Sequence, residues 1–227
     1  MRVAVRQESP RPPSSTYHLA TCVFATNKLK GYLNNMLDKK GRANAALALL
    51  LLASFALGCS ALTNLGKGSS EEANKLVQSA ADDLEEIDKI DQEASDKNDD
   101  LNQAQKDKNV DEVKRIIGEM IQDLDRGLER GNSAVDKIER ASKLTTNDKR
   151  KEFLTLKAQA FSKDIDAFKT LREAAVIARD NYTANGLPED KRKEYVNKNN
   201  AYKKMRQEAR EIHRKADDIA RQIPRGD

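Results

Sequence analysis

The chain has 227 residues and a formal net charge of +4; 34% of its residues are charged, 4% are aromatic, and it has no Trp, ten Gly and five Pro. This composition argues against an all-β sandwich or barrel and is typical of long helices. Two Cys and two His leave little material for a metal site or for nucleophilic catalysis.

The first 35 residues differ in composition from the rest of the chain. They contain Pro10, Pro12 and Pro13, and five Lys or Arg against one acid, Glu8, without an apolar period. We interpret residues 1–35 as a disordered or untranslated extension upstream of the true start at Met36. A basic, acid-poor stretch is also typical of an organelle transit peptide, and that alternative stays open.

Residues 36–58 are predicted to form a secretory signal peptide. Ala45–Leu57 is a run of thirteen residues without a charge, preceded by Lys39, Lys40 and Arg42. A bilayer-spanning helix needs about 20 apolar residues, so the run is short for a permanent span and suits the apolar region of a signal peptide. The basic residues predict that the following domain is sent outward across the membrane.

The end of this segment resembles the lipobox of bacterial lipoproteins. It reads Ala56-Leu57-Gly58-Cys59, in which the last two positions match that class and the first two are exchanged. The resemblance implies cleavage between Gly58 and Cys59, and lipid on Cys59. It also implies a lipid-anchored, exported protein of the cell envelope. Because Ser60 follows, the resemblance favours the outer membrane, facing the periplasm, in a cell with two membranes.

Two other readings of the junction stay open. Ala56-Leu57-Gly58 also fits the small-x-small rule of the ordinary secretory peptidase, which would leave Cys59 as a free thiol. The run could also be an uncleaved anchor with an incidental Cys behind it.

The sequence after Cys59 predicts an all-α fold. Residues 59–68, with Gly66 and Gly68, form a flexible linker after the lipidated Cys. Residues 69–227 form a helical bundle domain, whose four helices are expected to begin at Ser69, Asn109, Thr145 and Pro188. The first helix is expected to fray beyond Ile90, the third to close at Asn185-Gly186, and the fourth to stop at Pro224.

Heptad rows support this reading. They include Leu154, Phe161, Phe168, Ala175 and Tyr182 in the third helix, and Tyr195, Tyr202, Ala209, Ala216 and Ile223 in the fourth. Amphipathic helices joined by short loops predict an elongated antiparallel four-helix bundle, up-down-up-down, about 50 Å long. Many row positions are Ala, so the core is expected to be thin.

Charge divides the domain into two halves. Residues 59–143 hold 13 Lys or Arg and 21 Asp or Glu, a net of −8, and residues 144–227 hold 20 and 14, a net of +6. The mature protein would then carry −2. We interpret the division as an acidic hairpin packed on a basic hairpin.

Residues suited to chemistry are scarce after Cys59. His213 is the only His there, and a ferritin-like site needs Glu-x-x-His on two helices whereas position 210 is Arg, so we interpret His213 as a surface residue. The acidic run 82–86 is interpreted as a solvated face, and the Gly127/Gly131 spacing as close packing or a kink. We predict no enzymatic activity, no catalytic residues, no metal and no cofactor.

The leading functional hypothesis is a non-catalytic cell-envelope lipoprotein that acts as a helical spacer, adaptor or protein-binding module. Its expected partners are the membrane, through the lipid on Cys59, and an envelope protein, with no nucleic acid and no small-molecule substrate; the oligomeric state stays open. In the alternative, the basic fourth helix, with Lys191-Arg192-Lys193 and Lys203-Lys204, binds anionic envelope polymers or lipid headgroups. A third class is an enzyme whose site the sequence does not reveal.

Overall fold

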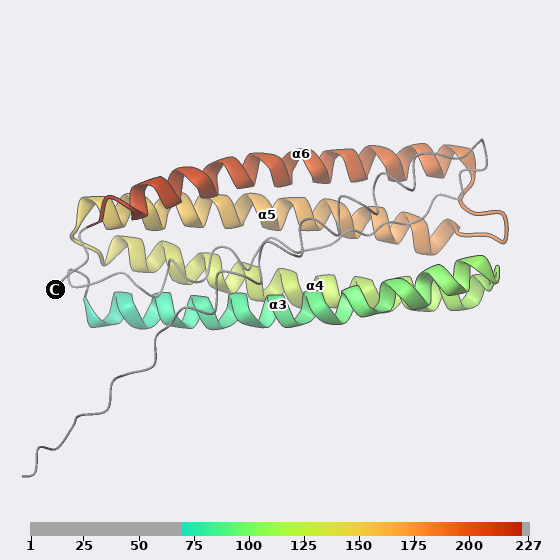
Figure 1. The fold of residues 1–227 in the computed structure, drawn as a ribbon, viewed down its shortest axis with the longest axis horizontal. Coiled ribbons are helices and arrows are strands. Elements are labelled where there is room, and N and C mark those ends of the chain that lie inside the picture. The colour runs from blue at the N-terminus through green and yellow to red at the C-terminus, as the bar shows by residue number, and fades with distance from the viewer. Residues whose placement is uncertain (1–69, 224–227) are drawn as a thin grey trace, which may run out of the picture. The chain divides into compact units, whose positions relative to one another are not determined.

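A computed structural model describes residues 70–223, which contain four long α-helices and no strand (Figure 1). The helices are α3 (Glu71–Lys106), α4 (Val110–Lys143), α5 (Asp148–Asn181) and α6 (Glu189–Ala220). The predicted all-α four-helix bundle is confirmed. The predicted extension 1–35, the signal peptide 36–58 and the linker 59–68 lie outside the described residues and stay predictions.

Side chains cap the first three helices close to the predicted starts. Ser70, one residue after the predicted Ser69, caps α3, and its Oγ accepts a hydrogen bond from the backbone N–H of Ala73 at 3.1 Å. Asn109 caps α4 as predicted. Asn147 caps α5, two residues after the predicted Thr145. Pro188 was predicted in the first turn of α6 but occupies the N-cap position just before it, without a side-chain cap.

Two predicted helix ends are wrong. α3 does not fray beyond Ile90 but continues to Lys106, because Ala94, Leu101 and Ala104 are buried along its second half. α5 ends at Asn181 rather than at Asn185-Gly186, since Tyr182 leaves the helix with an extended backbone. Gly186 instead takes a φ of +87° in the tight turn that joins α5 to α6.

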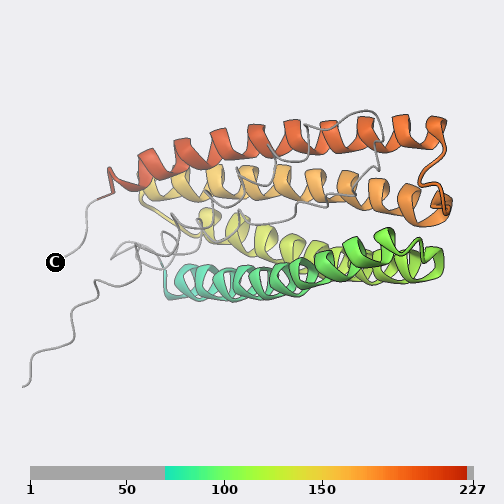
Figure 2. The same cartoon turned by 45° about the vertical axis from the view of Figure 1, so that its right-hand side comes forward.

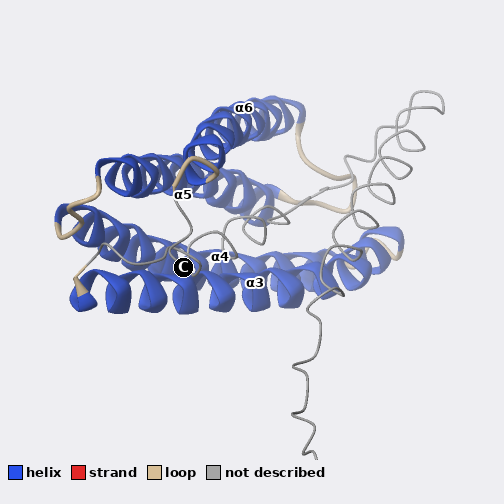
Figure 3. Cartoon of the chain, turned by 60° about the vertical axis from the view of Figure 1, so that its left-hand side comes forward, coloured by secondary structure: helices blue, strands red, loops and turns tan. Residues whose placement is uncertain are grey.

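Consecutive helices run antiparallel and side by side, as the views in Figures 1 and 2 agree. α3 packs on α4, α4 on α5, and α5 on α6, whereas no Cα of α3 lies within 8 Å of a Cα of α6. The described residues therefore form two helical hairpins, α3–α4 and α5–α6, that meet along the seam between α4 and α5. Short loops join the helices (Figure 3).

The beginning of α3 and the end of α6 lie at the same end of the bundle. Arg150, in the first turn of α5, donates from Nη2 to Oδ1 of Asn74 in α3 at 2.8 Å. Its neighbour Lys149 donates from Nζ to Oε1 of Gln222, just after α6, at 2.8 Å. The start of α5 thus ties both of these ends together.

The predicted heptad rows form the core. Phe161 and Phe168 are 1% and 4% exposed, and Tyr195 and Tyr202 are buried as well. Alanine fills many of the tightest positions, including Ala80, Ala134 and Ala174, which are fully buried. Small side chains allow close helix approach but remove little apolar area from water, so the stability of the bundle depends on the length of its seams.

Gly131 marks a close approach along the α4–α5 seam. A Cβ on Gly131 would lie 3.2 Å from Cγ1 of Ile165, so the buried side chain of Ile165 would have to shift to admit a larger residue there. The close packing predicted from the Gly127/Gly131 spacing is therefore confirmed at Gly131. A Cβ on Gly127, one turn earlier, would meet no atom within 4 Å, and Gly127 borders a small apolar cavity with Leu124 and Phe168.

These two glycines give a matched test of the seam. Gly127→Ala should raise the free energy of unfolding by about 0.5–1 kcal/mol, because Ala lowers the backbone entropy cost of the helix and meets no neighbour. Gly131→Ala should lower it, because the new methyl group displaces Ile165. Urea denaturation of both variants measures the difference. Equal shifts of the two unfolding midpoints would contradict the seam geometry.

Candidate functional site

The predicted lipidation site lies outside the described residues. Gly58 and Cys59 precede residue 70, so cleavage and lipid attachment at this pair stay predictions. None of the helices α3–α6 is long and apolar enough to cross a membrane. Within residues 70–223, no group of three or more His, Cys, Asp or Glu side chains is placed to hold a metal ion.

A polar cluster lies inside the α5–α6 hairpin. Asp164 of α5, with a side chain 4% exposed, accepts a hydrogen bond at Oδ1 from Nη1 of Arg206 at 2.6 Å. Nε2 of His213 lies 3.1 Å from the other carboxylate oxygen of Asp164. Arg206 and His213 are seven residues apart on α6, so both reach the same carboxylate.

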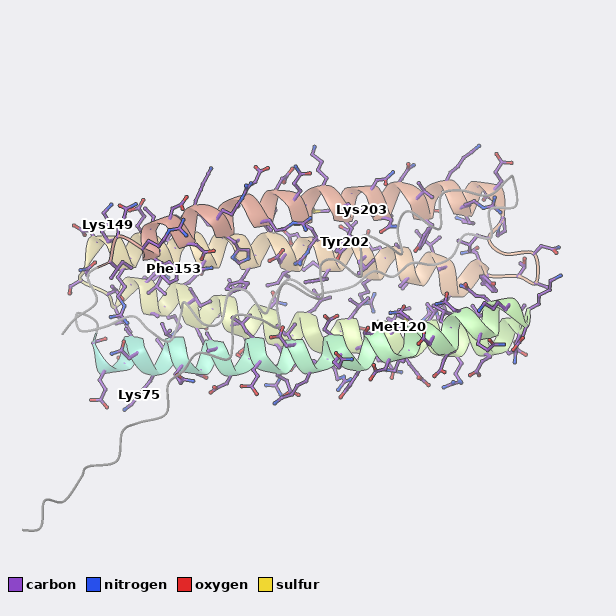
Figure 4. The ribbon with its side chains drawn as sticks, in the orientation of Figure 1. Lys75, Met120, Lys149, Phe153, Tyr202 and Lys203 are labelled. Atoms are coloured by element: carbon purple, nitrogen blue, oxygen red, sulfur yellow. The ribbon has the colours of Figure 1, made fainter. Side chains whose placement is uncertain are left out.

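Aromatic rings enclose this cluster. The guanidinium of Arg206 lies 5.0 Å from the ring centroid of Phe168, and the ring of His213 meets Phe161 edge-on at 4.8 Å. Tyr202 lies on the side of α6 that faces α5 (Figure 4), with its ring 6.1 Å from that of Phe168. The interpretation of His213 as a surface residue is therefore wrong, because its ring packs against α5 and its side chain is 16% exposed.

Removing the shared carboxylate should cost stability. Asp164→Ala leaves the buried guanidinium of Arg206 without this counter-charge, and we expect a loss of about 3 kcal/mol in the free energy of unfolding. Asp166→Ala is the matched control, because Asp166 is exposed on the same helix and pairs only with Lys169, one turn later, among the described residues. The control should cost less than about 0.5 kcal/mol. Similar losses for the two variants in urea denaturation would show that the cluster does not stabilise the hairpin.

Buried carboxylates also join α3 to α4. Asp83 accepts from Nζ of Lys137 at 2.5 Å, and Asp123 accepts from Nζ of Lys97 at 2.5 Å. Asp83 is 6% exposed, so the interpretation of the run 82–86 as a solvated face holds for Asp82 but is wrong for Asp83. These pairs lie within a hairpin, as does the pair of Lys157 with Asp217 in α5–α6.

Two acids of α3 lie near this buried network. Burial, together with the charge of Asp88, raises the pKa of Asp91 to about 7, while the nearby Arg206 of α6 lowers it. Burial, followed by the charge of Glu85, raises the pKa of Asp88 to about 6. Oδ1 of Asp91 is buried and accepts no hydrogen bond from the described residues. The ionised form of Asp91 is therefore destabilised by its surroundings, and the positive charge of Arg206 offsets only part of this effect.

These raised pKa values give the stability of the protein a pH dependence. A carboxyl with a raised pKa binds its proton more tightly in the folded than in the unfolded state, so it destabilises the fold as the pH rises from about 4 to about 7. Asp91→Asn should therefore raise the free energy of unfolding by about 1 kcal/mol at pH 8 and change it little at pH 4. The expected gain is kept small because solvent screens the partly exposed side chain of Asp91. Thermal unfolding of both proteins at the two pH values measures this. A gain that is equal at pH 4 and pH 8 would contradict the assignment.

The outer side of α6 carries a cluster of unpaired cations, which we call the α6 cationic face. It comprises Lys203, Lys204, Arg210, Arg214 and Lys215, all of them exposed. None of the five forms an ion pair within the described residues. Lys203, Arg210 and Arg214 follow the helical repeat at intervals of seven and four, so they lie along one line of the helix surface.

The remaining basic residues of α6 are mostly neutralised. Lys191 pairs with Glu194 and Lys193 with Glu189 within α6, so the predicted basic run at its start is balanced by neighbouring acids. Lys198 pairs with Glu173 of α5. The exposed cations without ion pairs therefore lie between the middle of α6 and its end. In that stretch, Glu211 is the one acid on the same side without an ion pair in the described part of the chain.

Comparison with known proteins gives no further assignment: no family model, no curated protein and no solved structure matches the chain.

The structure brings together residues that sequence reasoning missed. Asp164 and Arg206 lie on different helices, and only the packing of α5 on α6 reveals their contact. The available sequence signal was the seven-residue spacing of Arg206 and His213 on the side of α6 that holds Tyr195 and Tyr202. Two polar residues in a heptad row predict a polar partner across the interface.

Proposed function

We propose that the protein is a non-catalytic cell-envelope lipoprotein whose helical bundle serves as a spacer, adaptor or protein-binding module. The observation that carries the proposal is the position of Cys59. It follows the predicted signal peptide, residues 36–58, and precedes, by eleven residues, Ser70, which caps α3. A lipid there would tether the bundle at the end where α3 begins.

The length of the helices supports a role that depends on reach. α3 to α6 contain 32 to 36 residues each, which corresponds to about 50 Å at 1.5 Å per residue. The far end of the bundle, where α3 joins α4 and α5 joins α6, could therefore hold a protein partner well away from the tether. Antiparallel helices offer long, regular faces of the kind that protein partners recognise.

The α6 cationic face favours a second function. Five exposed cations without ion pairs in the described residues would attract anionic envelope polymers or lipid headgroups. Such a contact could operate alongside the tether.

Replacing Cys59 tests the proposed anchor. In cells fed a fatty-acid analogue, the wild-type protein should incorporate label and fractionate with membranes. Cys59→Ser should lose the label and accumulate either as an uncleaved precursor or as a soluble exported form. Two or three acyl chains supply stable membrane attachment, whereas a single chain would be marginal and a cleaved protein without lipid would be released.

The second cysteine provides the control. Cys22 lies in the segment 1–35 that we place upstream of the true start, so Cys22→Ser should leave both labelling and fractionation unchanged. A wild-type protein that takes up no label would favour ordinary secretory cleavage after Gly58 instead.

A further inference from the structure

We propose that the α6 cationic face lies on the anionic headgroups of the membrane that holds the lipid on Cys59, so that the bundle is oriented along the membrane surface as an adaptor. This inference rests on the proposed lipid anchor. It selects among the roles above, because a bundle held by α6 cannot stand upright as a spacer.

The position of the face relative to the tether is the first argument. α6 ends where α3 begins, since the start of α5 contacts Asn74 on one side and Gln222 on the other. Arg214 lies six residues before the last residue of α6, about 9 Å along the helix axis. Arg210, Arg214 and Lys215 thus lie in the half of α6 nearest the end where α3 begins, and Lys203 and Lys204 lie at its middle.

The length of the predicted linker is the second argument. Ten residues, 60–69, separate Cys59 from Ser70, and a flexible chain of that length spans about 17 Å on average and about 34 Å when extended. Three helix packings of about 8–10 Å each separate α3 from α6, which makes at most about 30 Å across the end of the bundle. An extended linker therefore covers the width of the bundle, so a bundle tethered through Cys59 can turn these side chains toward the headgroups.

The distribution of charge across the bundle sets the orientation. α3 carries four Lys against twelve Asp or Glu, a net of −8, and it lies at the opposite edge of the bundle from α6 (Figures 1 and 2). An anionic surface repels α3 and attracts the α6 cationic face. Both effects turn α6 toward the membrane and α3 away from it. The acidic hairpin α3–α4 is then left exposed to partners.

The chemistry of these cations suits headgroups. The five side chains are long, exposed and spread over about 18 Å of helix, from Lys203 to Lys215. Basic residues beside a membrane anchor strengthen attachment to anionic lipids, and a lipid chain combined with a basic patch gives stable binding where one signal alone is marginal.

Vesicle binding by the full, lipidated chain tests the proposal. The wild-type protein is mixed with vesicles of phosphatidylcholine, or of phosphatidylcholine with phosphatidylglycerol, at low and high salt. We expect about tenfold stronger binding to the anionic vesicles at low salt, and loss of this preference at high salt.

Two triple variants separate the α6 cationic face from net charge. Lys203→Gln/Arg210→Gln/Arg214→Gln should remove most of the preference for anionic vesicles. Lys106→Gln/Lys108→Gln/Lys114→Gln changes the net charge equally, at the far end of the bundle, and should retain the preference. Equal loss in both variants would overturn the assignment to α6.

A probe on each edge tests the orientation. With Cys59 blocked by lipid, a dye on Gln207→Cys, which lies on the same side of α6 as Arg210 and Arg214, should be quenched by a quencher attached to the headgroups. The same dye on Gln78→Cys, an exposed position near the start of α3, should not be. Equal quenching at the two positions would overturn the orientation.

The remaining outcomes separate this inference from the proposed function. A wild-type chain with no lipid contradicts the anchor at Cys59, whereas a lipidated chain with equal affinity for both kinds of vesicle contradicts only the role of the α6 cationic face. Retention of that chain on an anionic cell-wall polymer, without a preference for anionic vesicles, would overturn the headgroup assignment in favour of a polymer.

Discussion

The seam between α4 and α5 is the contact on which the arrangement of the two hairpins depends. α3 and α6 have no Cα atoms within 8 Å of each other, so neither can close the bundle by backbone packing. At the seam, Gly131 accepts Ile165 in close contact, and Nη2 of Arg172 donates to Oδ2 of Asp125 at 3.0 Å. The absence of a side chain at Gly131 therefore leaves room for Ile165 at the contact between the acidic and the basic hairpin. The same seam sets the position of the α6 cationic face relative to the start of α3.

Charged residues serve two different purposes in this fold. Within each hairpin, buried carboxylates such as Asp83, Asp123 and Asp164 pair with basic residues of the neighbouring helix. The desolvation of a buried ion pair offsets much of its electrostatic attraction, so these pairs add little net stability. We therefore interpret them chiefly as contacts that fix the register between helices. The cations on the outer side of α6 lack such partners in the described residues and remain available to an external anion. The ion pairs that join neighbouring helices therefore lie mainly within a hairpin. The pair of Arg172 with Asp125 crosses the seam between the acidic and the basic half.

The sequence predicted the helices and their buried rows well, because a seven-residue repeat sustained over more than 30 residues identifies the inner face of a helix directly. The predicted N-cap residue differs from the observed one where two suitable residues are adjacent: Ser69 was predicted, and Ser70 caps α3. The order of the second half of α3 was underestimated because that half is polar, whereas Ala94, Leu101 and Ala104 are buried along it. The roles of His213 and Asp83 were also missed. A helical period shows which residues share a face, but the charged partner across the interface depends on the register between two helices, which the sequence of one helix does not contain.

The proposed function and the proposed orientation both depend on where the mature chain begins. Mass spectrometry of the N-terminal peptide, taken from the protein purified out of native membranes, tests this start most directly. We predict a peptide that begins at Cys59 and carries the added mass of a diacylglyceryl group, with no peptide from residues 1–58. An unmodified N-terminus at Cys59, or peptides from residues 1–58 in the membrane-bound protein, would contradict the account.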